Sequence, residues 1–421
     1  MKNISGLIVD PSAWHEIVER SGWVVQSQVD ADRLGLVYCE GWADGKAVGP
    51  FSAQRARERD VSGEPYAVMI ADSDGRILAY VEIAWAARFA CSWHIDERHR
   101  RWQRIEYRKL DDGRLSLFDV KSWAYATPES PEFDNSSTWR RWQFFGDGNV
   151  KLEYSHAGGD SGGRGPSRVD PERFTCEWVF GDWARLCGLD TRADFYDLPI
   201  PESRSAAMVS RPWSPPEPLQ PEMLEELFTS GTRMELDTGD RVTVEVSVTG
   251  ALLLGNSGVV IDDPGSLCFH NDPLRVNVAP GEYTVELARV RFDNKPTHTR
   301  VAAAKLVVVD EPPVTWEMAR RSREDPIFLG DGEFFGFGVD SGAAAFVDGD
   351  MIDAVVEAVH EYYQNDDYGT ELAANGAVIF ESGWGDGTYP VWVGHDRNGV
   401  LCAVVADFCI AHRASVLHGN D

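Results

Sequence analysis

The apolar positions in the first half of the chain follow the pattern of short paired strands. Three stretches carry β-rich runs on both sides of a turn that contains Asp-Gly: YAVMIADSDGRILAYVEIAW (66–85), RIEYRKLDDGRLSLFDV (104–120) and RRWQFFGDGNVKLEYSH (140–156). Asp-Gly tolerates the positive φ that tight hairpin turns require. The pattern therefore predicts three antiparallel hairpins.

Helical spacing is rare in this half. Asp10 as a cap and Pro11 at the first helical position predict a helix that ends before Gly22, with Trp14 on its apolar side. FGDWARLCG (180–188) predicts a second, short helix. The glycine-rich run HAGGDSGGRGPS (156–167) predicts a flexible loop.

The second half is also dominated by strand patterns. DRVTVEVSVTG (240–250), GEYTVELARVRFDN (281–294) and RVAAAKLVVVDE (300–311) alternate or run apolar at strand length, and TYPVWVGHDRNGVLCAVVADF (388–408) predicts a hairpin that turns at Asn398-Gly399. One helix interrupts them in DGDMIDAVVEAVHEYYQN (348–365). Its expected apolar side consists of Met351, Val355, Ala358 and Tyr362.

Proline divides the chain. The segment PIPESRSAAMVSRPWSPPEPLQP (199–221) is too rich in proline for a helix interior or a central strand. We expect an α+β, mainly β protein with three parts. These are an N-terminal domain built on an antiparallel sheet (1–198), a linker (199–221), and a C-terminal β-sandwich or barrel-like domain with one long helix (222–421).

Composition narrows the class of protein. The chain has 421 residues, of which 43% are hydrophobic, so it can bury a core and is not disordered over most of its length. It shows no secretion signal and no apolar run that could span a bilayer, so we expect a cytoplasmic protein with no membrane partner. The seven cysteines never form a C-x-x-C pair, which favours reduced, mostly buried thiols.

Charge is more informative than composition. The net charge is −28, and residues 201–421 hold 36 acidic and 15 basic side chains, a net −21. Such a surface repels nucleic acid and anionic lipid and accelerates encounter with a basic partner. A solvated acidic surface that only maintains solubility is the equally weighted alternative.

Familiar catalytic signatures are absent: the sequence has no G-x-S-x-G, no H-E-x-x-H and no Walker loop. His94 and His99 could supply a base or a metal ligand, but a five-residue spacing suits neither a helix face nor a strand face. Arginines 98, 100, 101 and 104 surround Trp102, a weak indication of nucleic-acid contact in an acidic protein. Ser341 lies in a DSG setting without a histidine that can be placed beside it.

The stretch ESGWGDGTYPVW (381–392) is the most unusual local composition. Its glycines permit positive φ, and its rings supply rigid apolar area, which predicts a strand, a tight loop and a second strand. Carboxylates in glycine-rich loops can also hold calcium or magnesium. The candidates for such a metal site are Asp331, Asp340, Asp348 and Asp386.

Several C-terminal strings resemble the bacterial domain-of-unknown-function family 4241. They are APGEYTVELARVRFDN, RVAAAKLVVVDEPPVTWEMA, LGDGEFFGFGVDSGAAAFVD and FESGWGDGTYPVWVGHDRNGVLCAVVADF, and the resemblance covers about Thr238 to Phe408. Asp262, Ala343 and Ala344 depart from the family's pattern. The resemblance implies a fold but no reaction. The N-terminal region, with its many tryptophans and Asp-Gly hairpins, is similar in style to actinobacterial domains found beside secreted toxins.

These features together favour an immunity (antitoxin-type) protein that blocks a toxin domain with a basic surface and uses no cofactor. The expected contacts are Trp384, Asp386, Tyr389 and Asp396, with Asp366 and Asp367 at the end of the helix. The alternative is a metal-dependent hydrolase or nucleotide-processing enzyme that uses the four aspartates named above. A binding module for a small molecule between the sheets is a third possibility.

Overall fold

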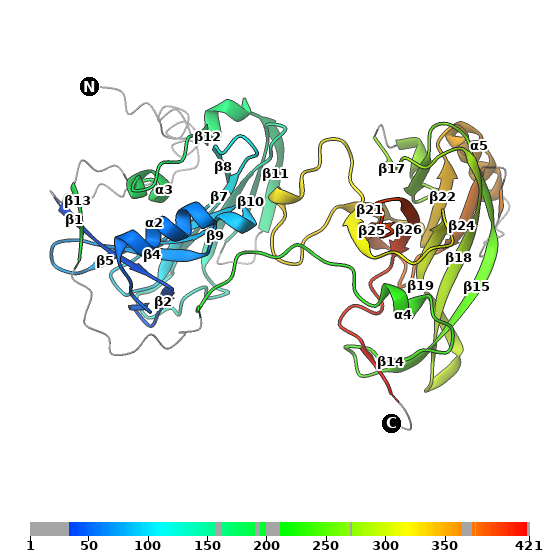
Figure 1. Cartoon of the computed structure of the whole chain (residues 1–421), viewed down its shortest axis with the longest axis horizontal. Helices are drawn as coiled ribbons and strands as arrows, with labels where there is room; N and C mark the ends of the chain where they lie inside the picture. The colour runs from blue at the N-terminus through cyan, green and yellow to red at the C-terminus, as the bar shows by residue number, and fades with distance from the viewer. Residues whose placement is uncertain are drawn as a thin grey trace. The chain divides into compact units, whose positions relative to one another are not determined.

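The computed structural model describes residues 33–156, 161–189, 194–198, 211–269, 272–363, 373–374 and 376–418. The chain divides into two compact units, one reaching to Glu217 and also including Ile327–Asp331, the other formed by Pro218–Pro326 and Gly332–Asp421 (Figure 1). Both consist mainly of antiparallel strands, as predicted. No helix within the described ranges is long and apolar enough to cross a membrane. The helix expected at Asp10–Gly22 lies outside the described residues.

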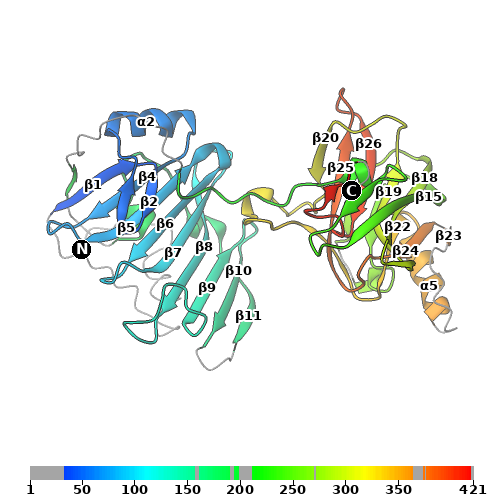
Figure 2. The ribbon, with the colours of Figure 1, turned by 90° about the horizontal axis from the view of Figure 1, so that it is seen from below.

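The first unit is built on an eleven-stranded sheet with the order β11-β10-β9-β8-β7-β6-β5-β4-β1-β13, and β12 pairs with β8 (Figure 2). Its strands are β1 (Arg33–Cys39), β4 (Tyr66–Ala71), β5 (Ile77–Ala84), β6 (Phe89–Ile95), β7 (Arg101–Lys109), β8 (Leu115–Ala124), β9 (Thr138–Phe144), β10 (Asn149–Ser155), β11 (Ser161–Arg168), β12 (Thr175–Cys176) and β13 (Asp194–Asp197). A separate hairpin joins β2 (Gly41–Ala43) to β3 (Lys46–Val48).

The three Asp-Gly hairpins are confirmed as β4–β5, β7–β8 and β9–β10. Their turn glycines Gly75, Gly113 and Gly148 all have φ between 80° and 87°, the region that side chains disfavour. The loop expected at 156–167 is wrong in part, because Ser161–Arg168 forms β11 and pairs with β10. Backbone pairing along an available strand edge here outweighs the low strand propensity of glycine.

One face of the first sheet is apolar and is covered by helices. Val68, Val81 and Ile105 belong to its buried cluster, together with Ala56 of α2 (Ala53–Ser62) and Leu186 of α3 (Trp183–Cys187). The short helix predicted at 180–188 is therefore confirmed as α3. It ends at Gly188, whose φ is 58°.

Polar side chains on β6 fasten α3 to this face. Ser92 Oγ donates to the carbonyl of Leu186 at 2.8 Å, and Nε2 of His94 lies 2.5 Å from the carbonyl oxygen of Cys187. Burial lowers the pKa of His94 to about 4, although the contact with Cys187 acts in the opposite direction. His99 lies apart, in the turn after β6, with a φ of 61°. The two histidines form no joint site.

His94 should make the first unit sensitive to acid. Because its folded pKa is below the unfolded value of about 6.5, its contribution is complete above pH 6.5 and is lost as pH falls through about 4. We expect the wild-type first unit to lose about 3 kcal/mol more than His94→Gln between pH 7 and pH 4. Urea titrations at the two pH values, read by hydrogen exchange in β6, measure this difference. Equal losses in both proteins would contradict the assignment, and His94→Asn provides a second neutral variant.

The second unit packs two sheets against each other. The first has the order β20-β25-β26-β19-β18-β15-β14-β27, with β21 paired to β25, and the second has the order β17-β16-β22-β24-β23. The strands are β14 (Arg233–Glu235), β15 (Arg241–Leu254), β16 (Val259–Asp262), β17 (Leu274–Val276), β18 (Gly281–Phe292), β19 (Lys295–Val307), β20 (Thr315–Met318), β21 (Gly336–Val339), β22 (Ala343–Asp348), β23 (Ala373–Ala374), β24 (Ala377–Glu381), β25 (Gly387–His395), β26 (Leu401–Asp407) and β27 (Ser415–Val416).

Buried side chains from both sheets, such as Leu287 and Phe346, form one cluster between them. The other face of the larger sheet is covered in part by α4 (Leu224–Leu227). The other face of the smaller sheet is covered by α5 (Ile352–Tyr363), the helix predicted in this half. Two residues of its expected apolar side are confirmed, because Val355 is buried and Met351 packs against the same cluster. Ala358 was wrong: it is exposed, and the larger Val359 takes the buried position beside it.

Candidate functional site

The stretch 381–392 forms the predicted strand, loop and strand, with the loop between β24 and β25. Gly383 and Gly385 have φ of 57° and 99°, so both occupy backbone conformations that favour glycine. A Cβ at Gly383 would lie 2.7 Å from Phe408. The loop therefore needs glycine both for its turn and for its close approach to the core.

Tyr389 fixes this loop from its buried side. Its side chain is buried, its ring packs on Phe337 and Phe408, and its hydroxyl donates to the carbonyl of Gly385 at 2.8 Å. Ser382 Oγ donates to the same carbonyl at 3.0 Å. These contacts fix the loop conformation. They also place Tyr389 in the core, whereas the sequence hypothesis assigned it to a partner contact.

Trp384 lies at the tip of the loop and is 57% exposed. Its ring contacts Phe292 at 6.1 Å between centroids, and the guanidinium of Arg300 lies 5.7 Å from its centre. Asp386, two residues further along the same loop, is also exposed. The loop thus exposes both an indole and a carboxylate.

The other residues predicted to contact a partner are not exposed on this loop. Asp396 caps the β25–β26 turn, where its carboxylate accepts from the amides of Asn398 and Val400 at 2.7 and 2.8 Å. This role in the hairpin turn explains its position without a partner. Asp366 and Asp367 lie outside the described residues.

The four aspartates of the metal hypothesis do not converge. Asp331 accepts from the amide of Glu217, Asp340 is exposed, and Asp348 accepts from the amides of Gly255 and Asp350. Over the described part of the chain, no three His, Cys, Asp or Glu side chains are grouped so that they could hold a metal ion.

A buried carboxylate that sequence reasoning did not single out organises the DSG segment. Asp263 is fully buried and accepts from the amides of Asp340 and Ser341 at 2.7 and 2.8 Å, from Ser341 Oγ at 2.7 Å and from the amide of Gly265 at 2.7 Å. The Ser341 hydroxyl is therefore a donor in a structural network. The DDPG string contained no signal for this, because the partners lie 77 and 78 residues away.

The first unit carries a second unpredicted feature, a sheet face rich in charge and tryptophan. We call it the polar face. It consists of side chains from β5 to β10 on the opposite side from the apolar cluster: Glu82, Trp93, Arg104, Glu106, Arg108, Asp119, Lys121, Trp123, Trp139, Arg141, Lys151 and Glu153.

The part of the polar face around Arg108 is covered. Arg108 is almost fully buried, donates to the carbonyl of Ile327 at 2.5 Å and stacks on Phe118, whose ring in turn packs on Phe328. Burial lowers the pKa of Arg108, although the neighbouring Glu106 opposes the shift. The segment Ile327–Asp331 thus covers this part of the face.

Glu82 is the most perturbed acid on the polar face. Burial raises its pKa to about 7, although hydrogen bonds from Trp93 and Tyr80 oppose the shift. The indole Nε1 of Trp93 donates to its carboxylate at 3.3 Å. The group therefore titrates near neutral pH, but it lies behind the indole of Trp93.

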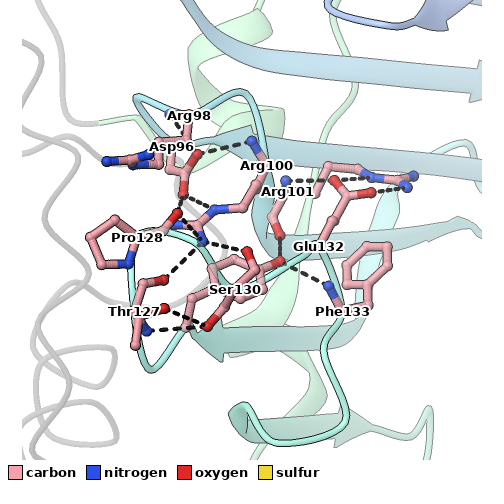
Figure 3. A network of polar contacts seen from close by, with 10 residues as sticks. Asp96, Arg98, Arg100, Arg101, Thr127, Pro128, Ser130, Glu132 and Phe133 are labelled. Atoms are coloured by element: carbon pink, nitrogen blue, oxygen red, sulfur yellow. Dashed lines mark hydrogen bonds and ion pairs between the residues drawn. The ribbon is translucent and has the colours of Figure 1, made fainter.

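A loop between β8 and β9 borders the exposed part of the polar face (Figure 3). Arg100 donates to the carbonyls of Thr127 and Ser130 at 3.2 and 2.8 Å, and Arg101 holds Glu132 through two hydrogen bonds of 3.0 and 2.7 Å. Arg104 pairs with Glu106 and Asp119, so three of the four arginines considered for nucleic-acid contact are engaged within the protein.

The comparisons with known proteins match only the C-terminal region of the chain. Residues 254–406 match the family model described as "Protein of unknown function (DUF4241)". This match confirms the resemblance of the C-terminal region. It spans less than half of the chain and includes the Trp384 loop and the Asp263 network. No curated protein matches the chain.

Proposed function

We propose that the protein is a cytoplasmic immunity protein that binds and blocks a toxin domain with a basic surface. The observation that carries the proposal is the rigid loop of the second unit that exposes Trp384 and Asp386. Tryptophan is among the residues that contribute most to binding when a partner covers them. An exposed aspartate on the same loop adds attraction to a cationic partner.

The construction of the loop supports this role. Tyr389, Ser382 and the close approach of Gly383 to Phe408 fix the backbone before any partner arrives. A preorganised loop loses less conformational entropy on binding than a flexible one. The packing of Trp384 on Phe292 leaves more than half of its surface available.

The net negative charge of the second half of the chain supports the proposal that the partner has a basic surface. The 36 acidic and 15 basic side chains of residues 201–421 give a net −21 that favours encounter with cationic surfaces. Association with a basic toxin should therefore slow steeply as salt rises, while dissociation depends mainly on the buried indole. A surface that serves solubility alone would show no such specific dependence.

The test uses the full chain and any secreted toxin domain that a neighbouring gene encodes. We expect co-expression to protect growth and Trp384→Ala to weaken binding by about 30-fold or more. Leu253→Ala is the matched control, because Leu253 is 69% exposed and lies on β15. Surface plasmon resonance measures both rates. The proposal fails if the toxin neither binds nor loses toxicity, or if Trp384→Ala binds as tightly as the control.

A further inference from the structure

The exposed part of the polar face contains three cations in one row. Arg104, Lys121 and Arg141 lie directly opposite one another on β7, β8 and β9. Neighbouring strands are about 4.8 Å apart, and like charges placed directly opposite destabilise a sheet. This cation row therefore needs a compensating negative charge.

The protein supplies only part of that charge. Arg104 and Arg141 share the fully buried carboxylate of Asp119, with Arg104 Nη2 at 2.9 Å and Arg141 Nε in close contact. Arg104 also pairs with Glu106 at 3.0 Å, and Arg141 lies 3.9 Å from Glu153, a carboxylate that Lys151 also engages at 2.6 Å. The buried carboxylate of Asp119, on the same face of the sheet, thus neutralises part of the charge of both arginines.

Lys121, the middle member, is different. No carboxylate of the described residues lies within 4.0 Å of its ammonium group, which instead sits 5.1 Å from the centre of the Trp123 ring and 4.4 Å from that of Trp139. Burial lowers the pKa of Lys121, and the charges of Arg104 and Arg141 lower it further, although the more distant carboxylates of Asp119 and Glu153 oppose the shift. An anion beside Lys121 would relieve this unfavourable arrangement.

Tryptophan rings adjoin the cations. Trp123 and Trp139 lie two residues along β8 and β9 from Lys121 and Arg141 and face each other across the strands. Both are only partly buried. The ring of Trp123 stacks on Trp93 at 6.1 Å between centroids, and Phe133, from the loop in Figure 3, packs on it in a tilted arrangement at 4.8 Å, which leaves Trp139 as the more accessible ring. The site thus combines positive charge with partly accessible aromatic faces.

We propose that this face binds a small anion joined to a planar ring, with nucleoside monophosphates as the ligand class. The phosphate would pair with Lys121 and Arg141, and the base would stack on Trp139. Two residues along a strand span about 6.7 Å, which is comparable to the separation of phosphate and base in a nucleotide. Base stacking on aromatic side chains contributes about 1–3 kcal/mol.

A long polyanion fits less well than a single nucleotide. The net charge of −28 repels an extended strand over its whole length, whereas a monophosphate experiences mainly the local cations. The site lies within the first unit and does not depend on the proposed toxin partner. Either proposal can fail without the other.

The test titrates the full chain by calorimetry with the four nucleoside monophosphates, with the matching nucleosides and with inorganic phosphate. We expect at least one monophosphate to bind with a Kd below about 1 mM, tenfold or more tighter than its nucleoside or phosphate alone. Lys121→Met should weaken this binding at least tenfold. Trp139→Leu should weaken the monophosphate but leave phosphate unchanged.

Lys109→Met is the matched control, because Lys109 also lies over a tryptophan, Trp85, in the same unit and carries the same charge. Lys121→Met removes a like charge, so its thermal transition should not fall, which separates lost binding from lost folding. The proposal is overturned if no monophosphate binds at about 1 mM, or if Lys121→Met binds as the control does. If an octanucleotide bound much more tightly than any monophosphate, with a strong dependence on salt, the proposal would be overturned in favour of a nucleic-acid strand as the ligand.

Discussion

Replacing Asp263 with alanine should destabilise the second unit by about 3 kcal/mol, because four partly buried donors lose their shared buried acceptor together. Asp263→Asn should be nearly as damaging. Both oxygens of Asp263 accept from donors, so the amide group of asparagine would face an N–H or O–H group. Hydrogen exchange in urea, followed at Asp340, Ser341 and β16, reports this unit separately from the other.

Ser341→Ala provides the internal comparison. It removes one donor and leaves the other three bonds of Asp263 in place, so it should cost about 1 kcal/mol. If Asp263→Ala costs no more than Ser341→Ala, the carboxylate does not organise the DSG segment as we infer.

Replacing Asp119 with alanine should destabilise the first unit by about 3–5 kcal/mol, because it leaves Arg104 and Arg141, the two neighbours of Lys121, without their shared buried counter-charge. Adding Lys121→Met should recover part of the loss, since only two neighbouring cations then remain. Urea unfolding of the four proteins of this double-mutant cycle, read by hydrogen exchange in β8, measures the coupling.

Glu172→Ala serves as the control for a surface charge. Glu172 pairs with Arg114 but is largely exposed, so its loss should change stability by less than about 1 kcal/mol. Additive effects of Asp119→Ala and Lys121→Met would show that the cation row is not electrostatically coupled.

The sequence predicted the elements whose signals are local. The Asp-Gly hairpins, the α3 helix and the loop around Gly383 all depend on neighbouring residues, and the structure has each of them. The α5 helix was also predicted, with Met351 and Val355 on its apolar side, although the buried residue of the next turn is Val359 and not Ala358. β11 was missed because its pairing with β10, not its glycine-rich composition, makes it a strand.

The candidate sites were harder to predict, because they depend on which distant side chains meet. Trp384 and Asp386 were found from composition and are exposed, whereas the same reasoning placed the buried Tyr389 beside them. The cation row escaped notice because Arg104, Lys121 and Arg141 come from three strands. Their proximity depends on strand register, which composition does not reveal.

Strand order gives the two units different routes to the native state. From β4 to β11, each strand of the first sheet pairs with its successor in the chain, so these contacts close short loops and can form one hairpin at a time as the polypeptide emerges from the ribosome. In the second unit, β19 can pair with the preceding β18 at once, but it gains its second neighbour, β26, only when Leu401–Asp407 has been synthesised. We expect the amino-terminal sheet to mature first, with the carboxyl-terminal unit as the slower step.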